Sequence, residues 1–300
     1  MFKGKRKFYY IIALVLLVVF YYWQNHTLQI TRYEFAYENL PRGFDGYRIV
    51  QISDMHGKTF GRNNIVLANR IKRLKPDLLL VTGDMISSTM VDEDAFFDFL
   101  DQFDKACPVY LCLGNHEQIV RQLSISGKNN DRYRNFIDNI SKKGAVLLDN
   151  EKTNIKNGED VIVLSGLSLE LYHYTRRDIE PYDENLSLTK SYIEGVLGST
   201  PEGFKILLAH NPAYFDEYVS WGADLILAGH IHGGIIRIPF LGGLFSPDKI
   251  FFPEFDAGLF EKGKSKMIVN RGLGCLGYSK INIRLFNRPE ITFIELLQKQ

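Results

Sequence analysis

Polar side chains that could bind a metal follow five short apolar runs along this chain, each at the point where the run ends in a turn. They are carboxylates, an amide and imidazoles, with no thiolate among them: Asp54, His56, Asp84, Asn115, His116, His210, His230 and His232. A mixed set of oxygen and nitrogen ligands suits Mn²⁺, Fe or Zn²⁺ better than Ca²⁺ or a structural cysteine-rich zinc site. The pattern therefore predicts a transition-metal site assembled from loops that are far apart in the sequence.

Two of these groups are pairs with the same spacing. Asp54 and His56 are two residues apart, and so are His230 and His232. In an extended backbone, residues i and i+2 point to the same side, so each pair is expected to face one cavity. The glycines beside these motifs permit tight turns and close approach of the backbone.

Each motif is weak when it stands alone. A single Asp-x-His is more often a surface or capping pair than a pair of ligands, and a single Gly-Asp is usually a turn. Gly-Asn-His-Glu at 114–117 and Gly-His-Ile-His-Gly-Gly at 229–234 are more specific. The five groups in this order favour one shared site over the alternative of turn residues with hydrogen-bonded histidines.

The elements that must position these loops alternate between strand and helix, which is the pattern of an α/β domain. Strands are expected at 47–53, 78–82, 109–113, 145–148, 161–166, 205–209, 225–228, 267–269 and 291–296, and helices near 63–74, 93–103, 133–142 and 189–197. In open α/β sheets, ligands bind outside the carboxyl ends of the strands, where all five groups fall. We expect one domain at 47–300, after a polar connector at 24–46.

The beginning of the chain is predicted to be a membrane element. Residues 8–23 carry no charge and have aromatic residues at both ends, as the interfacial belts of a spanning helix do. A cleaved signal peptide is the alternative, although no Ala-x-Ala site follows. Four basic residues lie in the tail at 1–7, before the apolar run, and only Arg32 follows soon after it. This charge bias predicts a single-pass protein of the cell membrane, with its amino terminus in the cytoplasm and its domain outside.

Charge and cysteine content argue against two classes of protein. The net charge is +1, and without the basic tail 32 basic residues stand against 35 acidic ones, so nucleic acid is not an expected partner. The three cysteines, Cys107, Cys112 and Cys275, are too few and too sparse for a disulfide framework. We expect buried thiols that act as small hydrophobic side chains.

At the metal-capable residues the sequence resembles the calcineurin-like metallophosphoesterase superfamily, whose motifs are Asp-x-His, Gly-Asp, Gly-Asn-His-Asp/Glu, a lone His and Gly-His-x-His. The resemblance runs from 47 to 296 and implies a four-layer α/β/β/α sandwich, here preceded by the transmembrane helix. Within the superfamily the chain is similar to the membrane-associated YkuE/YaeI-like branch, through Ser-Asp-Met-His-Gly at 53–57, Ala-His-Asn-Pro at 209–212 and Asn-Arg-Gly-Leu-Gly at 270–274. That branch usually has Leu and Gln where Met55 and Ile235 stand, which makes the rim of this site more apolar.

The resemblance also implies two divalent transition-metal ions, with Mn favoured and Fe or Zn as alternatives. It implies Asp54, His56 and His232 as ligands of one metal, Asn115, His210 and His230 as ligands of the other, Asp84 as the bridge, and His116 as a catalytic residue that is not a ligand. Two such metals could activate a bridging hydroxide and clamp the attacking and leaving oxygens. His116, if protonated, could donate a proton to the leaving alkoxide or stabilise charge on the phosphoryl oxygens.

The expected function is therefore metal-dependent hydrolysis of a phosphodiester or pyrophosphate bond on a phosphorylated small molecule or lipid. Three alternatives stay open: a UDP-2,3-diacylglucosamine-type lipid-nucleotide pyrophosphatase, whose usual cytosolic location conflicts with the expected topology, a non-catalytic metal-binding surface domain, and a membrane-tethered receptor or scaffold. The apolar stretch at 235–260 also has two interpretations. It is either a hairpin packed in the core or an apolar lip beside the metals that contacts lipid.

Overall fold

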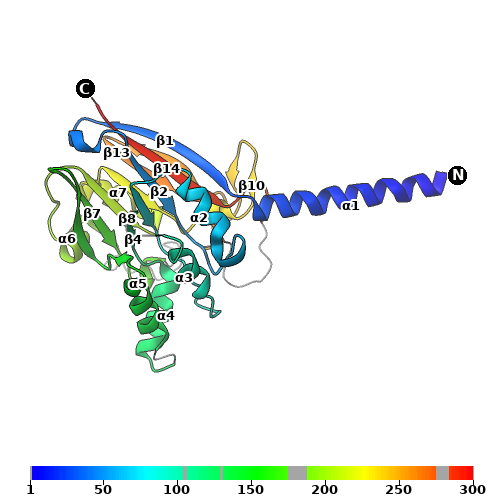
Figure 1. Ribbon diagram of the computed structural model, residues 1–300, viewed down its shortest axis with the longest axis horizontal. Helices are drawn as coiled ribbons and strands as arrows, with labels where there is room; N and C mark the ends of the chain where they lie inside the picture. The colour runs from blue at the N-terminus through cyan, green and yellow to red at the C-terminus, as the bar shows by residue number, and fades with distance from the viewer. Residues whose placement is uncertain (1, 104–106, 129–130, 175–187, 275–283, 300) are drawn as a thin grey trace.

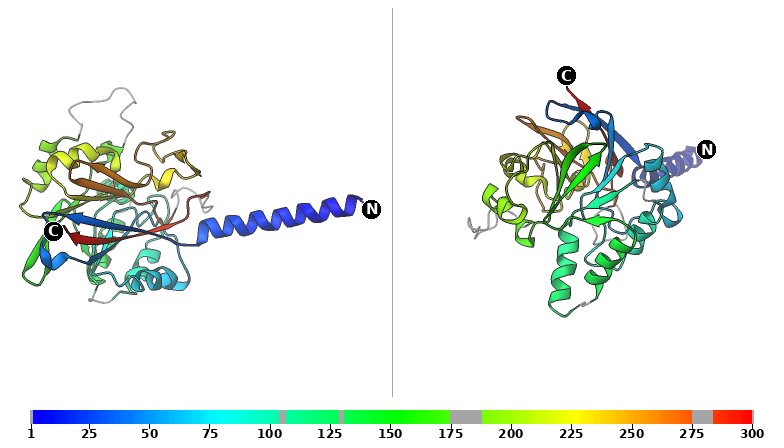
Figure 2. Two further views of the ribbon diagram at one scale, coloured as in Figure 1. Left: turned by 90° about the horizontal axis from the view of Figure 1, so that it is seen from above. Right: turned by 60° about the vertical axis from the view of Figure 1, so that its left-hand side comes forward.

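A computed structural model describes residues 2–103, 107–128, 131–174, 188–274 and 284–299. Two six-stranded sheets form its centre (Figures 1 and 2). The first has the order β1 (Gln29–Tyr37), β14 (Glu290–Gln298), β2 (Tyr47–Ile52), β3 (Leu78–Val81), β4 (Val109–Leu111) and β5 (Val146–Leu147). The second has the order β12 (Gly258–Lys262), β13 (Ser265–Val269), β9 (Leu225–Ala228), β8 (Lys205–Ala209), β7 (Asp160–Leu167) and β6 (Glu151–Asn157).

Helices cover the outer faces of both sheets, and a long helix projects from one end of the body (Figure 1). The helices are α1 (Phe2–His26), α2 (Ile65–Lys72), α3 (Asp94–Leu100), α4 (Asn115–Ile125), α5 (Arg132–Lys142), α6 (Lys190–Leu197) and α7 (Phe215–Trp221). A separate antiparallel ribbon is formed by β10 (Arg237–Ile238) and β11 (Gly242–Gly243).

The strand sequences explain why the structure has four layers. In β3, Leu78 and Leu80 belong to the core between the two sheets, whereas Leu79 and Val81 pack under the helices on the outside. Side chains alternate across a strand, so a strand that is buried on both faces reads as a continuous apolar run. The same division occurs in β8, and the expected α/β/β/α sandwich is confirmed.

The parallel pairing of the central strands brings the motif loops to one edge. β2 runs parallel to β3 and β3 to β4 in the first sheet, and β7, β8 and β9 run parallel in the second. The loops that carry the metal-capable residues follow these strands, so the two sheets present them toward the same crevice.

Residues 24–46 differ from the expected polar connector, because they contain strand β1. This strand pairs in parallel with β14 along its whole length, from Gln29 beside Glu290 to Tyr37 beside Gln298. Many of its side chains are only half buried because β1 lies at the sheet edge, which hides the apolar pattern of a strand. The edge strands β6 and β12, and helices α4 and α7, were also absent from the expected elements.

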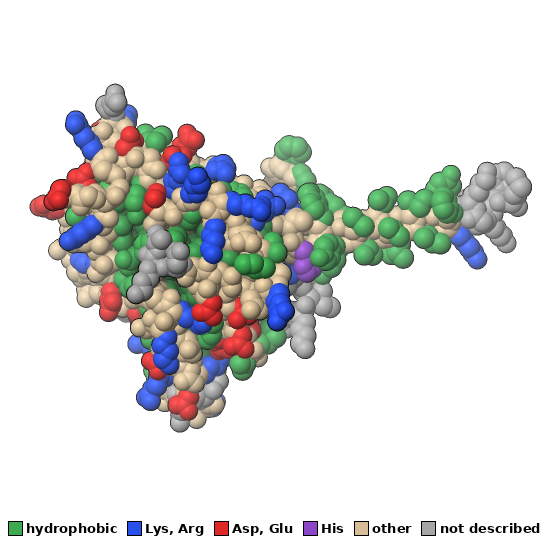
Figure 3. Space-filling view, viewed as in Figure 1, with side chains coloured by type: hydrophobic (Ala, Val, Ile, Leu, Met, Phe, Trp, Pro, Cys, Tyr) green, Lys and Arg blue, Asp and Glu red, His purple; other side chains and the backbone are tan. Residues whose placement is uncertain are grey.

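Helix α1 is the element expected to cross a membrane. Residues 7–26 are long and apolar enough to do so by length and composition. Most apolar side chains from Phe8 to Trp23 are exposed, and the helix stands clear of the body (Figure 3). Its last turn enters the fold, where Gln24 and Asn25 are buried.

The cysteine expectation is met in part. Cys112 is a buried thiol, Cys107 is half buried, and Cys275 lies outside the described residues.

Candidate metal and phosphoester site

The structure brings seven of the eight metal-capable side chains into three overlapping clusters. The clusters are Asp54, His56 and His232; His56, Asp84 and His116; and Asp84, His210 and His230, with the ligand atoms of each within 4.8 Å of one another. All seven side chains are buried. Asn115, the eighth residue, is the first residue of α4 and directly precedes His116.

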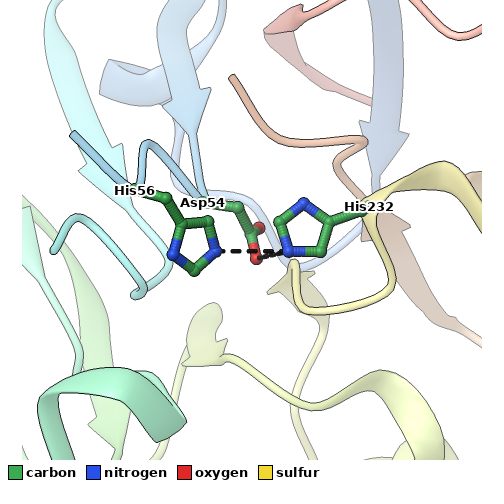
Figure 4. A group of neighbouring side chains, drawn as sticks. All are labelled: Asp54, His56 and His232. Carbon is green, nitrogen blue, oxygen red and sulfur yellow. Dashed lines mark hydrogen bonds and ion pairs between the residues drawn. The ribbon is translucent and has the colours of Figure 1, made fainter. Parts of the chain in front are cut away.

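The first cluster joins loops from the two sheets (Figure 4). Asp54 and His56 follow β2, and His232 follows β9. The Nε2 atoms of His56 and His232 face each other at 3.2 Å, and Nε2 of His232 lies 3.5 Å from Oδ1 of Asp54. Burial lowers the pKa of His56 to about 3 and holds the pKa of His232 well below its usual value, so both rings are neutral, as metal ligands must be.

Asp84 lies between the clusters. Its Oδ2 is 3.2 Å from Nε2 of His210 and 3.7 Å from Nε2 of His56, while its Oδ1 accepts a hydrogen bond of 2.8 Å from the backbone N–H of His116. Burial acts to raise the pKa of Asp84, but the neighbouring His210 and His116 outweigh it and hold that pKa well below the usual value. One ionised carboxylate therefore faces imidazoles on both sides.

The two i, i+2 pairs do converge, but the reason differs from the expected extended backbone. Five residues of the site have left-handed backbone conformations, with φ between +45° and +71°: Asp54, His56, Asp84, His230 and His232. Such φ values are uncommon for residues with a side chain and carry a conformational cost of about 1–3 kcal/mol each. The loops therefore turn sharply after each strand, and the surrounding fold holds them in that form.

Two glycines permit this close packing of loops. A side chain at Gly83, where φ is +86°, would meet the backbone of Gly114 at 2.5 Å and the ring of His210 at 2.9 Å. A side chain at Gly229 would overlap the hydroxyl of Ser53 and lie 2.5 Å from a carboxylate oxygen of Asp54. Only glycine leaves room for these contacts.

Glu117 joins two of the site loops. Its buried carboxylate accepts hydrogen bonds from the backbone N–H groups of Gly114, Asp84, Met85 and Ile86, at 2.8–3.2 Å. Burial and the nearby Asp84 raise its pKa to about 7, while these N–H groups favour the ionised form. The carboxylate thereby fixes the loop after β3 against the first turn of α4.

The hydrogen bonding of His116 determines which of its nitrogens carries the proton. The backbone N–H of Ser88 donates to Nδ1 of His116 at 2.9 Å. Because an accepting ring nitrogen has no proton, the proton of the neutral ring is on Nε2. Burial lowers the pKa of His116, and its ring contacts that of His56 with the centroids 4.6 Å apart. His116 is therefore held as a neutral Nε2–H donor beside the cluster.

The residues present fit a metal. The side-chain oxygen of Asn115 is buried and has no hydrogen-bond partner among the described residues. A buried amide oxygen without a partner is costly, and coordination to a cation would satisfy it. The Nε2 atoms of His56 and His232 also face each other. A cation bound by both nitrogens suits this arrangement better than direct contact between the two rings.

Comparison with known proteins assigns the family. The sequence model of the calcineurin-like phosphoesterases matches residues 47–234, which is more than half of the chain and includes all eight metal-capable residues. The chain belongs to the calcineurin-like phosphoesterase family.

Three relatives of this phosphoesterase are informative. It is 26% identical to the metallophosphoesterase YkuE of Bacillus subtilis, over 92% of this chain and 87% of that protein. It is 27% identical to the phosphodiesterase YaeI of Escherichia coli, over 84% and 82% of the two chains. It is 26% identical to the UDP-2,3-diacylglucosamine pyrophosphatase LpxG of Chlamydia trachomatis, over 92% of each. The phosphoesterase is thus a phosphoester hydrolase of the YkuE/YaeI-like branch.

Two residues that support the site of this phosphoesterase were missed from the sequence. Both carboxylate oxygens of Asp248 lie 3.0 Å from Nε2 of His230. Nδ2 of Asn287 donates to the backbone carbonyls of His232, at 2.7 Å, and Ile235, at 2.9 Å. Neither residue belongs to a metal motif. The sequence did contain one signal for a structural role. Asp248 and Asn287 lie close to apolar residues, in Leu-Phe-Ser-Pro-Asp-Lys-Ile-Phe-Phe at 244–252 and Leu-Phe-Asn-Arg at 285–288, and a polar side chain that is buried there needs a hydrogen-bond partner.

Tyr174 was also missed. Its ring lies against those of His230 and His210, with centroids 5.1 Å and 6.0 Å apart. It therefore packs beside the second cluster and restricts how those two imidazoles can turn.

Proposed function

We propose that this phosphoesterase uses two divalent transition-metal ions to hydrolyse phosphodiester or pyrophosphate bonds of a membrane- or envelope-associated substrate. The observation that carries the proposal is the position of Asp84, whose Oδ2 lies near Nε2 of both His56 and His210. A carboxylate shared by two sets of imidazoles is the arrangement that a binuclear site requires.

The ligands divide between the two metals in the proposed site. Asp54, His56 and His232 would hold one ion, Asn115, His210 and His230 the other, and Asp84 both. When bound, two such ions polarise a phosphoryl oxygen and lower the pKa of water so that it can attack phosphorus. Manganese is the favoured ion, and iron and zinc suit the same mixed oxygen and nitrogen set.

His116 is the proposed hydrogen-bond donor to the substrate. Its Nε2–H, set by the hydrogen bond from Ser88 to Nδ1, can donate to a phosphoryl oxygen or to the leaving oxygen. Because burial keeps the ring neutral near pH 7, it acts as a hydrogen-bond donor in the resting site. This residue disfavours a non-catalytic metal-binding domain, which would have no use for it.

A second candidate substrate is a lipid-linked nucleotide such as UDP-2,3-diacylglucosamine. The likeness to LpxG supports it, and so do the exposed apolar side chains that follow the last metal ligands. The proposed location counts against it. Helix α1 is proposed to be a single-pass anchor of the cell membrane, and the basic residues at its amino-terminal end favour a domain outside the cytoplasm.

Metal content and hydrolysis of an aryl phosphodiester test this function together. The wild-type chain should contain close to two transition-metal ions by mass spectrometry. Asp84→Asn and His210→Ala should each lose at least one, with hydrolysis reduced by at least about 100-fold. Asp138→Asn is the matched control, because Asp138 is exposed on α5, and it should keep both ions. A fully active preparation with one ion or none would contradict the binuclear site.

A further inference from the structure

Exposed apolar side chains gather on one part of the body. We call them the hydrophobic rim: Phe240, Leu241, Ile250, Phe251, Phe252 and Phe286. Phe240 is fully exposed, and Leu241 and Phe251 are 68% and 66% exposed. A soluble surface rarely leaves so many large apolar side chains together in water, so such a patch marks an interaction site. The apolar stretch at 235–260 is therefore in part a surface lip and not only a core hairpin.

The rim lies beside the end of helix α1. The rings of Phe20, on α1, and Phe286, in the rim, are 5.6 Å apart. Figures 1 and 2 show the β10–β11 ribbon next to the point where α1 leaves the body, and Figure 3 shows apolar side chains there that adjoin those of the helix. The apolar surface of α1 therefore continues onto the body.

Hydrogen bonds fix this geometry. The side chain of Asn25 bonds the backbone of Arg284 in both directions, at 2.9 Å to its N–H and 3.3 Å to its carbonyl. The side chain of Gln24 accepts from the backbone N–H of Asn287 at 3.2 Å. These partners are buried, so the helix leaves the body in a set direction and not on a free linker.

The β10–β11 ribbon is hydrogen-bonded to residues 284–287, the segment that also holds the end of α1. The backbone N–H of Arg237 donates to the carbonyl of Leu285 at 3.0 Å, and Asn287 donates to the carbonyl of Ile235. Asn287 also bonds the backbone of His232, a proposed metal ligand. Helix, rim and one loop of the metal site therefore form one connected unit.

The rim residues also have an unusual backbone. Phe240 and Phe252 have φ values of +70° and +50°. Bulky side chains avoid this region unless the fold imposes it. Both aromatic rings are exposed in this conformation. Backbone strain and exposed apolar area therefore both raise the free energy of the body in water. A bilayer that covers the rings would remove the second contribution.

The neighbouring side chains suit the boundary of a bilayer. Tyr21, Tyr22 and Trp23 stand at the body end of α1, and exposed Lys249 precedes Ile250 in the rim. Arg288 lies 4.8 Å from the ring of Trp23. Aromatic and basic side chains of this kind gather at the headgroup level of membranes.

We propose that the hydrophobic rim is a bilayer-docking surface, which inserts into the interface of the same membrane that α1 crosses. The inference rests on the proposed membrane location of α1. Because the rim, Asn287 and the His232 loop are connected, docking holds that loop next to the lipid headgroups. The substrate class that this arrangement serves is an amphipathic phosphoester whose apolar part stays in the bilayer.

Tryptophan quenching by brominated lipid tests the proposal on the full chain. The protein is reconstituted into vesicles of phosphatidylethanolamine and phosphatidylglycerol, with either ordinary or brominated acyl chains. The chain has two tryptophans: Trp221 is fully buried in the body, and Trp23 reports on the anchor. Phe240→Trp and Phe251→Trp are made in a Trp23→Phe background, so that each adds one reporter in the rim. Ile125→Trp is the control, because Ile125 is 79% exposed on α4, and α4 lies on the opposite side of the body from β10 (Figure 1).

Brominated lipid should reduce the added fluorescence of both rim reporters by about twofold or more and leave that of Ile125→Trp unchanged. If the rim reporters are unquenched while Trp23 in the wild-type chain is quenched, the anchor is in the bilayer and the docking surface is wrong. If Trp23 is unquenched as well, the proposed membrane location fails, and the inference fails with it. Blue-shifted emission without quenching would mean that protein, for example a second copy, covers the rim.

Discussion

Asp248 and His230 form a carboxylate–imidazole pair in which both carboxylate oxygens lie 3.0 Å from the ring Nε2. They come from different loops, 18 residues apart. Because the pair occupies Nε2 of His230, we propose Nδ1 as the nitrogen of His230 that would bind a metal. A carboxylate behind a ligating imidazole orients the ring and makes it a better ligand.

Asp248→Asn should therefore weaken the binding of metal by about 10- to 100-fold without removing the site. Titration with Mn²⁺, followed by direct metal analysis, measures the change. Glu254→Gln is the control, because Glu254 is an exposed acid in the same segment. An unchanged affinity in Asp248→Asn would show that the pair does not orient a ligand.

His116→Ala should keep its metals and lose activity in a way that depends on the leaving group. A hydrogen bond from its neutral Nε2–H to the leaving oxygen matters most when the departing alkoxide is basic and carries much developing charge, and much less for an activated nitrophenolate. The expected loss is about 10²- to 10⁴-fold on an alkyl ester and clearly smaller on a nitrophenyl ester. Parallel assays on the two substrates measure it. Equal losses on both would mean that His116 acts on the phosphoryl oxygens or positions the substrate, and does not act on the leaving oxygen.

Metal binding should release a proton from His210. Burial acts to lower the pKa of this imidazole, but Asp84 and Asp54 outweigh it and raise the pKa to about 10. The ring is thus protonated in the metal-free chain at neutral pH, whereas a ligand nitrogen must be free of its proton. Affinity should therefore rise with pH, by about tenfold per pH unit from this proton, and level off as pH approaches 10.

Calorimetry at pH 8 in buffers with different ionisation enthalpies counts the protons. One proton from His210 is expected for the metal that it binds. His26→Gln should leave the count unchanged, because His26 is exposed at the end of α1 and outside the clusters. Binding without proton release at pH 8 would contradict the expected state of His210.

Protease treatment of intact spheroplasts should remove a carboxyl-terminal tag from the proposed anchored protein. The basic residues before α1 favour a cytoplasmic amino terminus, which leaves the domain accessible from outside. The remaining fragment should stay with the membrane, as an uncleaved anchor requires. A tag that becomes sensitive only after lysis would place the site in the cytosol. Lipid-linked nucleotides would then become the favoured substrate.

The apolar runs in the sequence were sufficient to predict the central strands. β3, β9 and all of β8 after Lys205 are buried on both faces, so each reads as a continuous apolar segment that ends at a polar motif. Because parallel strands present their carboxyl ends at one edge, the convergence of the motif loops was predictable as well.

Strand β1 was not predictable in the same way. It lies at the edge of its sheet, and its pairing partner β14 is at the other end of the chain. An edge strand with one half-exposed face lacks a continuous apolar pattern, so its sequence resembles a polar linker. Pairing with a distant strand, and not local sequence, makes residues 29–37 part of the sheet.

The sequence by itself determined which residues can bind metal, because ligand chemistry is a property of side-chain type and order along the chain. Only the tertiary structure decided how those residues are held. The contact of Asp248 with His230, the contact of Asn287 with the backbone of His232, and the left-handed turns at Asp54 and Asp84 depend on the path of the chain between them. A one-dimensional pattern does not contain that path. The path is set by the packing of two sheets, and the first sheet takes strands from both ends of the sequence.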